Sequence, residues 1–128
     1  ATAPPLGRTA VVVPLTKLWS PNIGALPDRL PGVQHVENDE ARAKYDRAWG
    51  VTIPPKRGWN LSQMFDAMEH GDLSALYVIG ENPASSEADV GRARKLLGNL
   101  DTLIVQDLFM TKTATMADVL LPASNAAL

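Results

Sequence analysis

The sequence predicts an α/β fold built around a parallel sheet, and the second half of the chain carries the observations behind this prediction. Short apolar runs at residues 74–79, 103–105 and 119–121 lack the polar alternation expected of half-exposed strands. A helical apolar pattern lies between the first two runs, and a Thr/Ala-rich segment lies between the second and the third. Strands that alternate with helices along a chain build a parallel sheet through right-handed crossovers.

Residues 1–37 are predicted to form an irregular Pro/Gly-rich arm, because nine prolines and glycines fall within the first 32 residues. A segment without a periodic core of its own is typical of a piece of a larger protein. We therefore expect two parts, an arm at residues 1–37 and an α/β domain at residues 38–128.

Two helices are expected before the first of these strands. Asn38 is the predicted N-cap of the first helix, and Gly50 is its predicted exit. Asn60 is the predicted cap of the second, and Gly71 is its stop. Their apolar faces are Ala41, Tyr45, Ala48 and Trp49 in the first and Leu61, Met64, Phe65 and Met68 in the second.

A third helix follows the first apolar run, and a shorter helical segment follows the second. Ser85 or Ser86 is expected to cap the third helix, with Glu87 and Asp89 in its first turn. Its inner face contains Val90, Ala93, Leu96 and Leu97. Residues 111–117 are expected to form one or two helical turns.

The amino-acid composition excludes several classes of function. The chain has 128 residues, of which 45% are hydrophobic, so we expect a globular unit with a modest core. It contains no cysteine, which excludes a disulfide scaffold, a thiolate metal site and a cysteine nucleophile within the chain. His35 and His70 are too few for a histidine metal site, so no metal ligand is expected. The formal net charge of −2 predicts no nucleic-acid partner.

The same residues predict no membrane span and no secretory signal. The longest apolar run near the N-terminus, residues 10–13, is closed by Pro14, far short of the roughly 18 residues that a span needs. Residues 1–8 have neither the basic start nor the apolar stretch of a signal peptide. We therefore expect a cytoplasmic location.

Chemistry is expected at two loops, because ligands of open parallel sheets bind outside the carboxyl ends of the strands. The first loop starts with residues 80–83, and the second starts with residues 106–107 and leads to Thr111 and Thr113. Gly80 permits close approach of a ligand to the backbone. Glu81 or Asp107 can accept hydrogen bonds from ribose hydroxyls or from purine N–H groups, and Ser86 at a helix start can hold a phosphate. Together these features predict a site with the shape and polar groups to bind a nucleotide.

Spacing alone also permits a purely structural interpretation of both loops. In that interpretation Asn82 begins an ordinary turn, Ser86 is an ordinary helix cap, and Asp107 satisfies loop amides. The sequence contains neither the GxGxxG fingerprint nor a Walker loop. It also offers no convincing carboxylate pair and no Ser/His/Asp set, so no catalytic residue is expected.

Both loops lie in a stretch that resembles a known family. Residues 75–124, ALYVIGENPASSEADVGRARKLLGNLDTLIVQDLFMTKTATMADVLLPAS, resemble the molybdopterin oxidoreductases, and within them the alpha subunits of formate dehydrogenases. Residues 23–51, IGALPDRLPGVQHVENDEARAKYDRAWGV, are similar to the segment that precedes it in those enzymes. The motifs GENP and VQDLFMTKTATMADVLLP are specific in combination.

The resemblance implies a three-layer, Rossmann-like α/β domain that holds one guanine dinucleotide of a bis(molybdopterin guanine dinucleotide) cofactor with Mo or W. The parent enzyme would oxidise formate to CO2. The partners implied are the remaining domains of that enzyme and its electron-transfer subunits. By motif position, the residues implied in cofactor binding are Gly80, Glu81, Asn82, Ser86, Gln106, Asp107 and Thr111.

The chain also departs from the family pattern. The catalytic cysteine or selenocysteine, its adjacent histidine and the iron–sulfur cysteines have no counterpart. We therefore expect a portion of the enzyme that is inactive alone, retains no cofactor alone and exposes an apolar patch.

Three alternatives stay open. The chain could come from a related nitrate reductase or from the large peripheral subunit of respiratory complex I, in the second case as a remnant without cofactor. The polar residues Glu81, Asn82, Gln106 and Asp107 argue against the remnant. The third alternative is a free-standing interaction domain that docks through its Trp-bearing arm.

Overall fold

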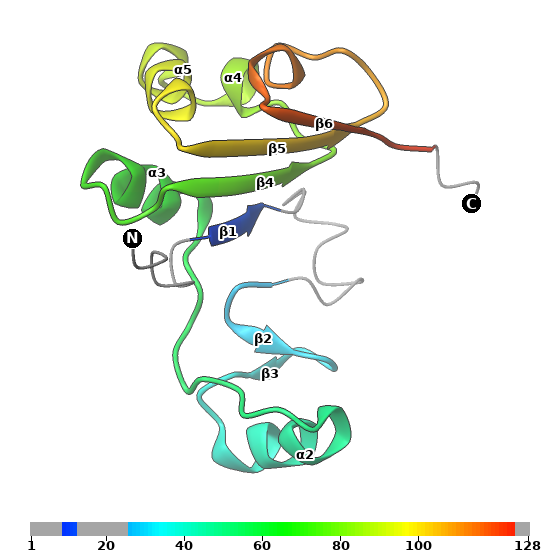
Figure 1. Cartoon of the computed structure of the whole chain (residues 1–128). Coiled ribbons are helices and arrows are strands. Elements are labelled where there is room, and N and C mark those ends of the chain that lie inside the picture. The colour runs from blue at the N-terminus through cyan, green and yellow to red at the C-terminus, as the bar shows by residue number, and fades with distance from the viewer. Residues whose placement is uncertain (1–8, 13–25, 125–128) are drawn as a thin grey trace, which may run out of the picture. The chain divides into compact units, whose positions relative to one another are not determined.

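A parallel sheet of four strands organises the larger of two units in the computed structural model (Figure 1). The structure describes residues 9–12 and 26–124. Residues 9–12 and 61–124 belong to the sheet unit, and residues 26–60 form the second unit. The helix that begins after Asn38 is thus part of the second unit, although the sequence analysis grouped it with the sheet.

The sheet contains the three predicted strands and one that was not predicted. Its order is β1-β4-β5-β6, with every neighbouring pair parallel. The predicted strands are β4 (Ala75–Ile79), β5 (Thr102–Asp107) and β6 (Val119–Pro122), which confirms the α/β class. The additional strand, β1 (Thr9–Val12), lies within the range that was expected to be irregular and pairs with β4.

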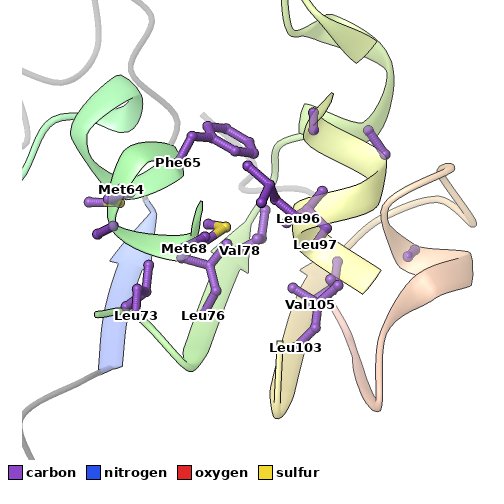
Figure 2. Close-up of a cluster of buried hydrophobic side chains, with 14 residues drawn as sticks. Met64, Phe65, Met68, Leu73, Leu76, Val78, Leu96, Leu97, Leu103 and Val105 are labelled. Atoms are coloured by element: carbon purple, nitrogen blue, oxygen red, sulfur yellow. The ribbon is translucent and has the colours of Figure 1, made fainter. Parts of the chain in front are cut away.

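Helices cover one face of this sheet. The unit contains α3 (Leu61–Glu69), α4 (Pro83–Ser86), α5 (Val90–Gly98) and the 3-10 turn η1 (Ala114–Met116). Figure 2 shows side chains of α3 and α5 packed against Val78 and Val105 of the strands. The predicted apolar face of α3 is confirmed, because Met64, Phe65 and Met68 are buried in this core.

Strand order explains why the described helices of this unit share one face of the sheet. Leu76 pairs with Leu103 and Val78 with Val105, so these four buried side chains point to the same side. The order β1-β4-β5-β6 never reverses, and right-handed crossovers in one direction place all their helices on one side. The described residues of this unit therefore supply one helical layer, whereas a three-layer arrangement needs a second.

The helix after the first loop begins differently from the sequence prediction. Neither Ser85 nor Ser86 caps it, because both belong to the separate short helix α4. The chain is extended again at Glu87, and Asp89 becomes the N-cap of α5, accepting from the Arg92 amide at 2.8 Å. Proline favours the first turn of a helix, which explains why α4 starts at Pro83.

An ion-pair cluster links α5 to α3 on the surface. The Arg92 guanidinium lies 2.8 Å from the Asp66 carboxylate and 2.6 Å from the Glu69 carboxylate. The hydrogen bonds that the guanidinium donates, first to Glu69 and second to Asp66 in order of effect, raise the pKa of Arg92 above its ordinary value. All three side chains are substantially exposed, so we assign them a role in aligning the helices rather than a large share of stability.

The second unit contains the hairpin strands β2 (Arg29–Leu30) and β3 (Gln34–His35) and the helix α2 (Asp39–Trp49). The Asn38 cap is confirmed, since its side chain accepts from the Ala41 amide at 3.0 Å. The Gly50 exit is also confirmed, with φ of 66°. The predicted apolar face is only partly buried, because Trp49 is 52% exposed.

No helix in the described part of the chain is both long enough and apolar enough to cross a membrane.

Candidate functional site

The two predicted loops begin side by side at the carboxyl edge of the sheet. Ile79 pairs with Gln106 in the parallel ladder, and the Gly80 amide donates to the Gln106 carbonyl at 2.8 Å. Gly80 adopts φ of 61°, a left-handed conformation that glycine enters without steric cost. The structure therefore brings the first and second loops together at their starting points.

The first loop is held by Asn82. Its carbonyl accepts from the Ser85 and Ser86 amides, at 2.8 Å and 3.0 Å, which starts the short helix α4. The Asn82 side chain makes no cap bond to that helix. Its Oδ1 instead accepts from the backbone amide of Thr113, at 3.1 Å, and from the Thr113 hydroxyl, at 2.9 Å.

Ser86 lies at the end of α4 and not at a helix start. Its hydroxyl donates to the Asn82 carbonyl at 3.1 Å, and the side chain is exposed. The prediction that Ser86 stands at a helix start, where it could hold a phosphate together with the helix N-terminus, is therefore wrong about the position of Ser86. Ser86 nevertheless remains attached to the first loop.

The second loop is organised by Asp107. Its Oδ1 accepts from the Leu108 amide at 2.7 Å and from the Phe109 amide at 3.3 Å. Its Oδ2 accepts from the Thr111 hydroxyl at 3.3 Å, and that hydroxyl accepts in turn from the Ala114 amide at 3.2 Å. Asp107 satisfies loop amides, as the structural interpretation of the sequence expected.

Glu81 and Gln106 retain unused polar atoms at this edge. Among the described residues, no hydrogen bond or ion pair engages the half-buried Glu81 carboxylate. The Gln106 Oε1 accepts from the Tyr77 hydroxyl, while its amide nitrogen donates to no described group. The edge therefore presents a free anionic acceptor and a free amide donor from adjacent strands.

Thr113 also belongs to this site, although it is not among the residues predicted to bind the cofactor. It is fully buried, and besides its contacts with Asn82 its hydroxyl accepts from the Ala84 amide at 3.0 Å. It lies in the run TKTAT, where Thr111, Thr113 and Thr115 occupy alternate positions. Nothing in that local pattern distinguishes the buried threonine from its neighbours.

Exposed apolar side chains flank the second loop. Leu108, Phe109 and Met110 are 49%, 75% and 68% exposed. Leu121 of β6 is also exposed, and β6 is an edge strand among the described strands. The expected exposed apolar surface is thus confirmed in this region.

The described residues offer other candidate features that contain none of the predicted site residues. A pocket of about 200 Å³ lies between α3 and α5, lined by Ser62, Phe65, Glu87, Ala88, Asp89, Arg92 and Ala93. In the ranges 9–12 and 26–124, no group of three or more acidic or histidine side chains is arranged to hold a metal ion.

Comparison with known protein families identifies similar sequences. The model of the family described as molybdopterin oxidoreductase matches residues 17–127. Formate dehydrogenase H of Escherichia coli (strain K12) is 42% identical over 105 residues, which is 81% of this chain and 15% of that protein. The putative formate dehydrogenase YrhE of Bacillus subtilis (strain 168) is 43% identical over 103 residues, or 80% of this chain and 10% of that protein.

A third relative has a less specific name. The probable oxidoreductase YjgC of Bacillus subtilis (strain 168) is 39% identical over 103 residues. This chain spans between 10% and 15% of the length of these three relatives.

Proposed function

This chain belongs to the molybdopterin oxidoreductase family, and we propose that its two loops form one wall of the binding site for a molybdopterin guanine dinucleotide. The single observation that supports this most is the pair of free polar groups, the Glu81 carboxylate and the Gln106 amide, at the edge where the loops meet. In the parent enzyme, a formate dehydrogenase, the bis(molybdopterin guanine dinucleotide) with Mo or W would supply the redox chemistry when bound.

The residues present fit the hydrogen-bonding pattern of guanine. Guanine offers N–H donors on one edge and the acceptors O6 and N7 on another. The free Glu81 carboxylate can accept from those donors, and the Gln106 amide nitrogen can donate to those acceptors. A carboxylate has about four lone-pair positions, of which Asp107 uses three within its own loop, so Asp107 keeps one for a ligand.

The other predicted residues would shape this wall. Gly80 lets the ligand approach the backbone, and Thr111 keeps the Asp107 carboxylate in place. Asn82 and Ser86 hold the first loop. These residues shape the site and keep its binding groups in place, and no catalytic step is assigned to them.

The names of the relatives favour formate as the substrate of the parent over nitrate. Two of the three are named formate dehydrogenases, one of them putatively. The free polar groups at Glu81 and Gln106 also favour a nucleotide site over a remnant that has lost its cofactor. The remaining domains of the parent and its electron-transfer subunits are the partners we propose.

Nucleotide titration tests the proposed site. We expect GMP and GDP to bind the pure chain with Kd near 1 mM, about 4 kcal/mol, because one wall encloses only part of a ligand. AMP and ADP should bind more weakly, since adenine has an acceptor at N1 where guanine has N1–H, and it lacks the 2-amino group that would donate to Glu81. NMR titration should show shifts at Gly80, Glu81 and Gln106. The proposal would be contradicted if all four nucleotides bound with equal affinity, or if the folded chain bound none of them.

We also predict that the pure chain does not oxidise formate. It contains no cysteine and therefore lacks the thiol ligands that iron–sulfur clusters require. The measurement is reduction of an artificial electron acceptor, with and without formate, on chain from which metals have been removed and on chain supplied with molybdate. Formate-dependent turnover in either sample would show that catalytic groups are present.

A further inference from the structure

Thr113 places one buried hydroxyl between the two loops. The hydroxyl donates to Asn82 Oδ1 at 2.9 Å and accepts from the Ala84 amide at 3.0 Å. The Thr113 amide donates to the same Asn82 oxygen at 3.1 Å. These three hydrogen bonds join segments that are about 30 residues apart in the chain, and the Thr113 side chain is fully shielded from water.

Because of these contacts, the Asn82 side chain does not cap its own helix, which is the usual role of an asparagine at this position. Asparagine at an N-cap position commonly accepts from an amide of its own helix. Here the Asn82 side chain makes no such bond, and the free amide of Ala84 in the first turn is satisfied by Thr113 from the other loop. Each loop thus supplies a partner that the other needs.

The same short segment reaches Asp107. The Thr111 hydroxyl donates to Asp107 Oδ2 and accepts from the Ala114 amide, next to Thr113 in the chain. A continuous set of hydrogen bonds and one peptide link, between Thr113 and Ala114, therefore runs from Asp107 in the second loop to Asn82 in the first. Movement of one loop relative to the other would break buried hydrogen bonds, which is costly.

We propose that Thr113 is a positioning residue that fixes the two loops of the nucleotide site relative to each other, and that Asn82 acts through Thr113 rather than through direct contact of its oxygen with a ligand. This inference rests on the proposed function. Its consequence is that Glu81 and Asp107 already have their binding positions before a nucleotide binds. A ligand then binds without having to order the loops itself.

Substitutions at Thr113 test the inference. Thr113→Val keeps the shape but removes the hydroxyl, and we expect the Kd for GMP to rise about tenfold, since Asn82 and Ala84 each lose a buried partner. Thr113→Ser restores the hydroxyl and should bind within about twofold of wild type. Thr115→Val is the matched control, because Thr115 is exposed and bonds only locally, to the Lys112 carbonyl at 2.8 Å. It should bind like wild type.

Affinity must be measured on folded molecules, which NMR titration allows because their signals are resolved from unfolded chain. If Thr113→Val lowers only the unfolding midpoint and its folded fraction binds GMP with the wild-type Kd, the inference is overturned. If Thr113→Val does not fold, Asn82→Ala interrupts the same link from the other loop. We expect a similar rise in Kd, together with faster hydrogen exchange of the Thr113 amide.

Hydrogen exchange on the wild-type chain separates this inference from the proposed function. The Ala84 and Thr113 amides should exchange as slowly as amides of β4 and β5. Fast exchange at both positions would overturn the inference even if GMP binds. If the wild-type chain binds no guanine nucleotide but protects both amides from exchange, the proposed function is overturned. The hydrogen bonds through Thr113 would then hold the two loops together, but they would position no nucleotide.

Discussion

Asp107→Ala is expected to weaken GMP binding by about 10- to 100-fold, the range of a lost charge-assisted hydrogen bond. The Asp107 carboxylate holds the Leu108 and Phe109 amides and the Thr111 hydroxyl. Its removal therefore takes away a proposed ligand acceptor and also loosens the second loop. Starting from a Kd near 1 mM, the Kd for GMP should rise to between about 10 and 100 mM, which NMR titration would register as much smaller shifts at the same GMP concentration.

Asp107→Asn separates the two contributions. Asparagine keeps one carbonyl oxygen that can accept from the Leu108 and Phe109 amides, but it carries no charge. We expect this variant to keep the slow exchange of the loop amides and still lose about tenfold in affinity for GMP. Asp101→Asn is the control, since it makes the same charge change at an exposed position just before β5, at the other end of the strand. If Asp107→Ala binds GMP with the wild-type Kd, Asp107 is not part of the nucleotide site.

The second large effect is expected for Leu103→Ala, in the core of the sheet unit. Leu103 is 1% exposed and lies on the same sheet face as Leu76, beneath the helices. Removing a buried leucine side chain costs about 2–5 kcal/mol, because contacts are lost and a cavity remains. A small domain has only about 5–15 kcal/mol of stability in total, so this single change should remove a large share of it.

The measurement must report on the correct unit. Trp49 and Trp59 lie in the unit of residues 26–60 and not in the sheet unit, so a probe within the sheet itself is needed. Hydrogen exchange of β4 and β5 amides in increasing urea follows the sheet directly. Leu108→Ala is the matched control, because Leu108 is 49% exposed, and it should change stability by less than about 0.5 kcal/mol. Equal effects of the two substitutions would contradict the core assignment.

Several elements could be predicted from residues that are close together in the chain. The α2 helix begins at the Asn38 cap and ends at Gly50 because both signals act on neighbouring backbone groups. The strands β4, β5 and β6 follow from short apolar runs. The positions of both loops follow as well, since parallel strands end at one edge of their sheet.

Other features depend on partners that are distant in the chain. β1 pairs with β4 through backbone groups, which leave no mark on the side-chain pattern of a Pro-rich segment. The sharing of one sheet face by the helices depends on the order in which strands pair.

The features of the candidate site also fall into those that local sequence predicts and those that depend on distant partners. Local sequence was sufficient to predict that Glu81 and Asp107 stand near the carboxyl ends of adjacent strands, because strand ends and polar residues are local signals. It could not predict that Ser86 ends one helix while Asp89 starts the next, or that Thr113 meets Asn82. Those outcomes required the folded chain, since a hydrogen bond across 31 residues forms only when the sheet brings its two loops together.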